Sequence, residues 1–140
     1  MLHLAICDKS LNDTEQMEKY LENIKFFNFD YEVFENAKEL YKYQTQHHEN
    51  FDIYILSIEL EDMLGLEVAR KLREDSQEAL IIFVSNDAKC VFDVFDVFTF
   101  AFLLKPLTYN KFSTTLYAFN YLYRTKTVSY THLRAHETGR

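Results

Sequence analysis

The chain has 140 residues, of which 48% are hydrophobic and 16% aromatic, and its formal net charge is −7. This composition is typical of a folded globular domain and excludes an intrinsically disordered chain. The acidic balance argues against binding to nucleic-acid backbones, and no apolar run reaches the roughly 20 residues that span a bilayer. The N-terminus lacks the pattern of a signal peptide, and the two cysteines, Cys7 and Cys90, form no metal or redox motif. We therefore expect one cytoplasmic domain with reduced thiols and no membrane association.

Short apolar runs alternate with segments of helical period along the chain. The expected strands are Leu2–Cys7, Tyr31–Glu35, Ile53–Leu56, Leu80–Val84 and Phe100–Leu104. The expected helices cover residues 12–24, 36–46, 65–75, 88–97 and 110–124, and Asn12 with Glu15 has the spacing of a capping box at the start of the first. Five strands alternating with five helices predict an α/β fold with helices on both faces of a parallel sheet. Continuously apolar strands agree, because parallel strands are buried on both sides.

The last stretch of the chain, Ser129–Arg140, has a different character. It reads SYTHLRAHETGR, has no apolar period, and carries more bases than acids. It is similar to a translated sequencing adapter, so we expect it to contribute nothing to the fold. The expected division is a domain over residues 1–127 and an unstructured, non-native tail over 128–140, with a native protein that continues beyond Thr127.

Polar side chains stand where four of the expected strands end. The first strand is followed by Asp8 and Lys9, the third by Ser57 and Glu59, the fourth by Ser85, and the fifth by Lys105. Periodicity leaves two strand orders of the mononucleotide-binding type open. In the flavodoxin-like order 2-1-3-4-5 the first strand lies beside the third, and all these side chains meet at one crevice.

Three stretches resemble the receiver domain of a two-component response regulator, most closely the LytTR (LytR/AgrA) type. They are LAICDKS near the start, FDIYILSIELEDMLGLEVARKLR in the middle, and LIIFVSNDAKCVFDVFDVFTFAFLLKPL towards the end. The resemblance runs from residue 2 to about residue 125. It implies the flavodoxin-like three-layer fold with five helices and the strand order 2-1-3-4-5. It also implies a role in phosphorelay signalling and transcription regulation in bacteria, rather than catalysis.

Several residues match the functional positions of that family. Asp8 matches the first acid of the metal-binding pair, and Ser85 matches the hydroxyl that closes onto the phosphoryl group. Phe102 matches the switch aromatic, and Lys105 matches the lysine that pairs with the phosphoaspartate. The resemblance also implies a cis peptide bond between Lys105 and Pro106.

Two positions depart from the family pattern. Ser57 stands where the family has its phosphoacceptor aspartate, and Lys9 stands where it has the second acid, a direct magnesium ligand. A serine hydroxyl is a weak nucleophile without a base, and Mg²⁺ prefers carboxylate oxygens. With Asp8 and Glu59 facing Lys9 and Lys105, we expect a self-neutralised pocket in which Lys9 takes the place of the ion and metal binding is weak or absent.

The leading hypothesis is a pseudo-receiver that acts by protein interaction or dimerisation. The expected partners are a sensor histidine kinase or another signalling protein, a second copy through the fourth helix, fifth strand and fifth helix, and DNA only through a missing C-terminal LytTR domain. The aromatic run that could form the dimer face, although most of it should be core, is Phe92, Phe95, Phe98, Phe100 and Phe102. An alternative, a small Rossmann-like phosphatase, would need an acid at Ser10. A flavodoxin-like cofactor binder is disfavoured by the presence of only two glycines, and an ordinary receiver silenced by engineered substitutions stays open.

Overall fold

The computed structural model describes residues 1–75 and 78–122, so the predicted tail lies outside the described residues. A single parallel sheet forms in the order β2-β1-β3-β4-β5, which confirms the predicted strand order. The strands are β1 (Leu2–Cys7), β2 (Phe29–Phe34), β3 (Ile53–Ser57), β4 (Leu80–Ser85) and β5 (Ala101–Leu104). All five predicted strands are therefore present, within two residues at each end.

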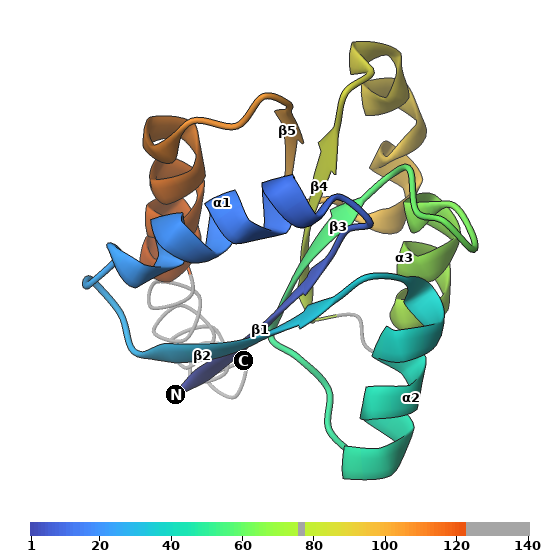
Figure 1. Ribbon diagram of the computed structural model, residues 1–140. Helices are drawn as coiled ribbons and strands as arrows, with labels where there is room; N and C mark the ends of the chain where they lie inside the picture. Colours follow the sequence, from blue (N-terminus) through green and yellow to red (C-terminus); the bar gives the residue numbers. More distant parts are fainter. Residues whose placement is uncertain (76–77, 123–140) are drawn as a thin grey trace, which may run out of the picture.

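Helices cover both faces of the sheet, as expected for parallel strands (Figure 1). One face carries α1 (Leu11–Glu22) and a C-terminal helix that begins at residue 109 and is described to residue 122. The other face carries α2 (Ala37–His47), α3 (Gly65–Asp75) and two short 3₁₀ helices, η1 (Ala88–Asp93) and η2 (Phe95–Val97). The result is the three-layer α/β/α arrangement that the sequence predicts.

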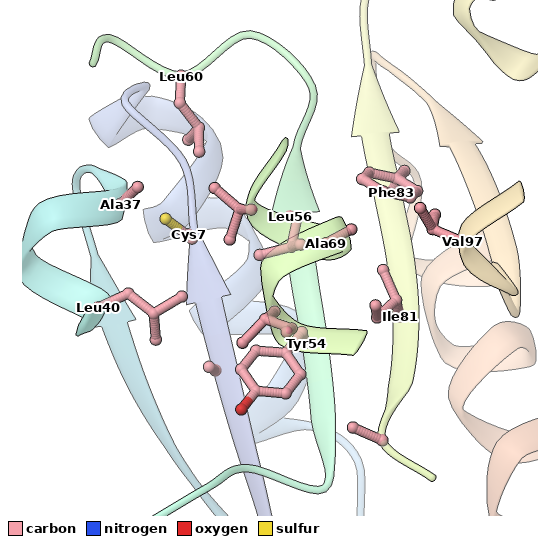
Figure 2. Close-up of a cluster of buried hydrophobic side chains, with 14 of the residues drawn as sticks. Cys7, Ala37, Leu40, Tyr54, Leu56, Leu60, Ala69, Ile81, Phe83 and Val97 are labelled. Carbon is pink, nitrogen blue, oxygen red and sulfur yellow. The ribbon is translucent and has the colours of Figure 1, made fainter. Parts of the chain in front are cut away.

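Each strand contributes to both hydrophobic cores because side chains alternate across the sheet. In β3, Ile53 and Ile55 face α1 and the C-terminal helix, whereas Tyr54 and Leu56 face α2 and α3. Figure 2 shows the second of these cores, where side chains from β1, β3 and β4 meet those of α2, α3 and η2. All five residues of β3 are buried, so this strand runs through the centre of the domain and ends in Ser57.

The predicted fourth helix is not α-helical, which corrects the sequence prediction of five α-helices. Residues 88–97 form η1 and η2 instead. The segment is rich in valine, phenylalanine and aspartate, which are weak helix formers. Its buried residues Val94 and Val97 are three positions apart, and this spacing suits a helix of three residues per turn.

The N-cap of the first helix lies two residues earlier than predicted. The N-cap is Ser10, whose side chain accepts from the Asp13 amide at 3.3 Å. The prediction of a capping box formed by Asn12 and Glu15 is therefore wrong. Ser10 rather than Asn12 is the N-cap because the Ser10 amide donates to Asp8 Oδ1 at 3.0 Å. This hydrogen bond fixes the turn between β1 and α1. This early start brings Asp13 into the first turn of α1, close to the ends of the strands.

Candidate functional site at the carboxyl ends of the strands

The sheet register brings the predicted polar residues to one edge. Cys7 pairs with Leu56, Ser57 with Val84, and Ser85 with Leu104. The residues that end these strands, or directly follow them, therefore lie side by side along the carboxyl edge. In parallel α/β sheets this edge is where ligands bind and chemistry takes place.

Lys105 forms the charged centre of the site. Its Nζ atom lies 2.8 Å from Asp8 Oδ2 and 2.8 Å from Asp13 Oδ2. The side chains of Lys105 and Asp8 are 6% and 1% exposed, and that of Asp13 is 29% exposed. An ion pair this far removed from water is much less screened than a surface pair. The pair holds the lysine over the end of β1.

Opposing effects act on the pKa values of this group. Burial alone would lower the pKa of Lys105, but its hydrogen bonds to Asp13 and Asp8 outweigh burial and raise it. Burial would raise the pKa of Asp13, but hydrogen bonds from Lys105 and Ser10 leave it below its usual value. Both shifts favour the charged forms, so the ion pair persists through the neutral pH range.

Asp13 was missed by the sequence analysis, and Lys9 does not lie where it was expected. Lys9 is exposed, and within the described part of the chain the cation that contacts Asp8 is Lys105. The carboxyl edge therefore carries three acids, Asp8, Asp13 and Glu59, and one lysine in these contacts, a net charge of 1 − 3 = −2, not the predicted zero. The sequence feature that could have identified Asp13 as a site residue is its position three residues after the N-cap Ser10. An acid in the first turn of a helix faces back towards the start of that helix.

Ser85 forms the second half of the site. It is fully buried, and its hydroxyl donates to Glu59 Oε1 at 2.5 Å while accepting from the Asp87 amide at 3.0 Å. The other carboxylate oxygen, Glu59 Oε2, is buried and has no hydrogen-bond partner among the described residues. A hydroxyl bonded to a carboxylate at this distance is a strong, charge-assisted contact.

Ser57, the last residue of β3, lies between these two groups. It is 1% exposed, and its hydroxyl donates to the Glu59 backbone carbonyl at the long distance of 3.4 Å. In the described residues, no side chain in contact with the Ser57 hydroxyl is placed to take its proton. Without such a base the hydroxyl is a poor nucleophile.

The loop after β3 is held tightly against Ser57. The Gly65 amide donates to the Ile58 carbonyl at 2.8 Å, and Glu59 forms an isolated antiparallel bridge with Leu64. A Cβ atom at Gly65 would lie 2.0 Å from the Ser57 carbonyl oxygen, so only glycine fits this close approach. This packing fixes Glu59 in front of Ser85.

Phe102 is half-buried and packs against the core that faces α2 and α3. Two neighbours in sequence are more open, since Phe98 is 71% exposed and Leu104 is 41% exposed. Phe100 is half-buried, and the side chains of Phe92 and Phe95 lie outside the described residues. The Lys105–Pro106 peptide bond is cis, as the resemblance implies.

The donor set does not fit a magnesium ion. In residues 1–75 and 78–122, no three His, Cys, Asp or Glu side chains are placed to hold a metal ion together. Asp8 already accepts from Ser10 and pairs with Lys105, whereas Mg²⁺ needs oxygen ligands in a near-ideal octahedron. The Asp8 carboxylate is therefore engaged in hydrogen bonding and ion pairing within the chain.

The fold and the polar edge together define a doubly wound α/β domain, and sequence comparison gives its family. Residues 4–117 match the response regulator receiver domain family, so the chain belongs to the receiver domains. No curated protein sequence matches the chain. No helix among the described residues is long and apolar enough to cross a membrane.

Solved receiver structures share the fold at low sequence identity. The response regulatory domain of mrkE from Klebsiella pneumoniae superposes with a TM-score of 0.78 at 14% identity, covering 89% of this chain and 99% of that one. TrrA from Thermotoga maritima, in complex with Mg²⁺ and beryllofluoride, gives 0.71 at 22% identity, covering 84% and 98%. The beryllofluoride-activated DrrB receiver domain gives 0.72 at 19% identity, covering 85% and 97%. These likenesses concern the fold alone.

Proposed function

We propose that this chain is a pseudo-receiver, a receiver domain that signals by protein interaction or dimerisation without accepting a phosphoryl group at an aspartate. The observation that carries the proposal is the buried Ser57 hydroxyl at the end of β3, where the family has its phosphoacceptor. A second observation supports it, because Lys105 is already paired with Asp8 and Asp13 and is not free to meet a phosphoryl oxygen.

The finer assignment is to the LytTR type of bacterial transcription regulator. It rests on the similarity of SIELEDMLGLEVARKLR to the family stretch after its phosphoacceptor. Under this assignment the domain works in the cytoplasm with a sensor histidine kinase or another signalling protein. DNA is then bound by a LytTR domain beyond residues 1–127, and the tail over residues 128–140 is foreign to the native protein.

A homodimer is proposed through the surface formed by η1, β5 and the C-terminal helix. Exposed apolar side chains between η2 and the end of β5 support it, since Phe98 is 71% exposed and Leu104 is 41% exposed. The phosphatase alternative loses support because Ser10, the position that would need its second acid, caps α1.

The test is intact mass spectrometry after incubation with acetyl phosphate and Mg²⁺. Three proteins are compared: the native chain, the Lys9→Asp/Ser57→Asp double variant, and Lys9→Asp alone as a control without an acceptor. The proposal expects a gain of one phosphoryl mass only in the double variant, because it alone carries both acids of the family site. A phosphorylated native protein would overturn the proposal, whichever residue carries the group.

A further inference from the structure

Resting on this proposed function, we propose that Glu59 and Asp13 together act as an internal substitute for the acidic group that a receiver carries at its phosphoacceptor position. Glu59 holds the switch serine Ser85, and Asp13 shares Lys105 with Asp8. The two contacts set the switch residues in a fixed arrangement that needs no phosphoryl donor.

The serine half of this arrangement is built from the loop after β3. Glu59 is fixed by its bridge to Leu64 and by the close packing of Gly65 on Ser57. From this position its Oε1 atom accepts the Ser85 hydroxyl at 2.5 Å. Ser85 thus meets a negatively charged oxygen that belongs to the chain itself.

The contact continues from Ser85 into the segment that replaces the fourth helix. The Ser85 hydroxyl accepts from the Asp87 amide at 3.0 Å, and Asp87 in turn caps η1 by accepting from the Lys89 amide at 2.9 Å. The backbone carbonyl of Ser85 also accepts from the Lys105 amide at 2.7 Å. The Ser85 hydroxyl therefore sets the start of η1, and the Ser85 backbone carbonyl joins the same residue to the end of β5. Both elements belong to the surface proposed for dimerisation.

The lysine half is built from α1. Because Ser10 caps the helix, Asp13 lies in its first turn and reaches Lys105 at 2.8 Å. Asp8 alone would leave the ammonium group with one carboxylate, and Ser57 supplies none. Asp13 provides the second carboxylate from a different element, so the lysine is held from two sides.

Amide hydrogen exchange measures whether the contact of Glu59 with Ser85 stabilises the start of η1. We compare the native chain with Glu59→Ala, Glu59→Gln and Ser85→Ala, and use Glu61→Gln, an exposed acid of the same loop, as the matched control. Losing a hydrogen bond to a charged group corresponds to roughly a tenfold change in an opening equilibrium. We expect exchange of the Asp87 amide and of residues 88–93 to rise about tenfold in Glu59→Ala and Ser85→Ala, less in Glu59→Gln, and not in the control.

The double variant Glu59→Ala/Ser85→Ala should exchange no faster than Ser85→Ala alone, because Ser85→Ala already removes the hydroxyl through which Glu59 acts. Unchanged exchange in Glu59→Ala, or additive effects in the double variant, would overturn the role of Glu59. If Glu59→Ala does not fold, the same two criteria apply to Glu59→Gln, which keeps the size of the side chain.

The lysine half is tested in parallel by ¹⁵N-detected NMR of the Lys105 ammonium group. The native chain should show a protected ammonium signal, and Asp13→Asn should lose that protection about tenfold or more, whereas Glu15→Gln on the same helix should keep it. An equally protected signal in Asp13→Asn would overturn the role of Asp13. These outcomes are separate from phosphorylation: a native protein that gains a phosphoryl mass contradicts the pseudo-receiver, whereas unchanged exchange contradicts only the internal substitute.

Discussion

The apolar interior of the sheet and the polar edge at its carboxyl end differ in how closely they follow the receiver family. The interior keeps the pattern, with a wholly buried β3 and a glycine packed on its last residue. At the edge, Lys105 pairs with Asp8 and Asp13 and Ser85 contacts Glu59, and under the proposed function Ser57 stands in place of the phosphoacceptor. Under the proposed function, the contrast teaches that packing can hold a fold while a few polar positions change what the fold does.

The largest effect is expected in the interior, from Gly65→Ala. The added methyl group would meet the Ser57 carbonyl oxygen at 2.0 Å, and because that atom is backbone, relief requires moving the strand end or α3. We expect a loss of about 3 kcal/mol or more in the free energy of unfolding, measured by urea denaturation. Leu64→Ala, at the exposed neighbouring position, is the control, and an equally small loss in both variants would show that the close approach is not needed.

A polar group inside the apolar region gives the next largest effect. The residue Arg73 is 8% exposed. Its guanidinium group donates to the backbone carbonyls of Val97, Ala79 and Phe98 at 2.7, 2.6 and 2.9 Å. Arg73→Met keeps the aliphatic volume but leaves these carbonyls without their donor, so we expect a loss of about 2–3 kcal/mol.

The matched control for this variant is Arg70→Met. Arg70 is an exposed arginine of the same helix, and its pair with Asp96 is 3.5 Å long. We expect it to change stability by less than about 1 kcal/mol. Similar urea midpoints for the two variants would mean that Arg73 does not tie α3 to the segment before β5.

At the polar edge, Asp13→Asn should destabilise the domain in a pH-dependent way. Because the pKa of Asp13 is lowered in the folded state, its contribution is present above the unfolded pKa and is lost as the pH falls through the folded pKa. We expect a loss of about 1 kcal/mol at pH 7 that shrinks in acid, measured by urea denaturation at several pH values. Glu15→Gln should show no such dependence, and a pH-independent difference for Asp13→Asn would contradict the ion pair with Lys105.

The smallest effect is expected at the opposite end of the sheet, at His3. A hydrogen bond to Asp30 raises the pKa of His3, which burial slightly opposes, and the charges of Asp30, Glu49 and Asp52 add to it. Because the pKa of His3 is higher in the folded state, its contribution to the free energy of unfolding is fully present below the unfolded-state pKa. That contribution is lost as the pH rises through the folded-state pKa. His3→Gln should therefore cost about 0.3 kcal/mol in acid, since the site is exposed and screened, and less at alkaline pH. An equal cost at both pH values, measured by thermal unfolding, would exclude the charged histidine.

The sequence predicted most of the fold because the strands are continuous apolar runs bounded by polar residues. It failed at η1 and η2, where three-residue spacing of Val94 and Val97 resembles an α-helical period over a short window. It failed again at the N-cap, where Ser10 and Asn12 are both good capping residues. That choice depended on the Asp8 contact to the Ser10 amide, which no local pattern reports.

At the site, the sequence placed residues along the edge but not their partners. Strand ends identified Asp8, Ser57, Glu59, Ser85 and Lys105, which follow directly from the element order. Side-chain partners depend on helix phase and loop course, so Asp13 was missed and Lys9 was placed in the pocket although it is exposed. The contact of Ser85 with Glu59 likewise depends on how Gly65 pulls the loop against β3.

The most direct measurement is an amide NMR titration with beryllofluoride and Mg²⁺, which mimics a phosphoryl group and needs no chemical step. The Lys9→Asp/Ser57→Asp variant serves as the positive control. The native chain should show no saturable shifts at residues 57, 85 and 105, while the variant should show saturable shifts at all three. Saturable shifts in the native chain at those residues would contradict the pseudo-receiver, because they would show that the pocket still binds a phosphoryl-like group with its metal.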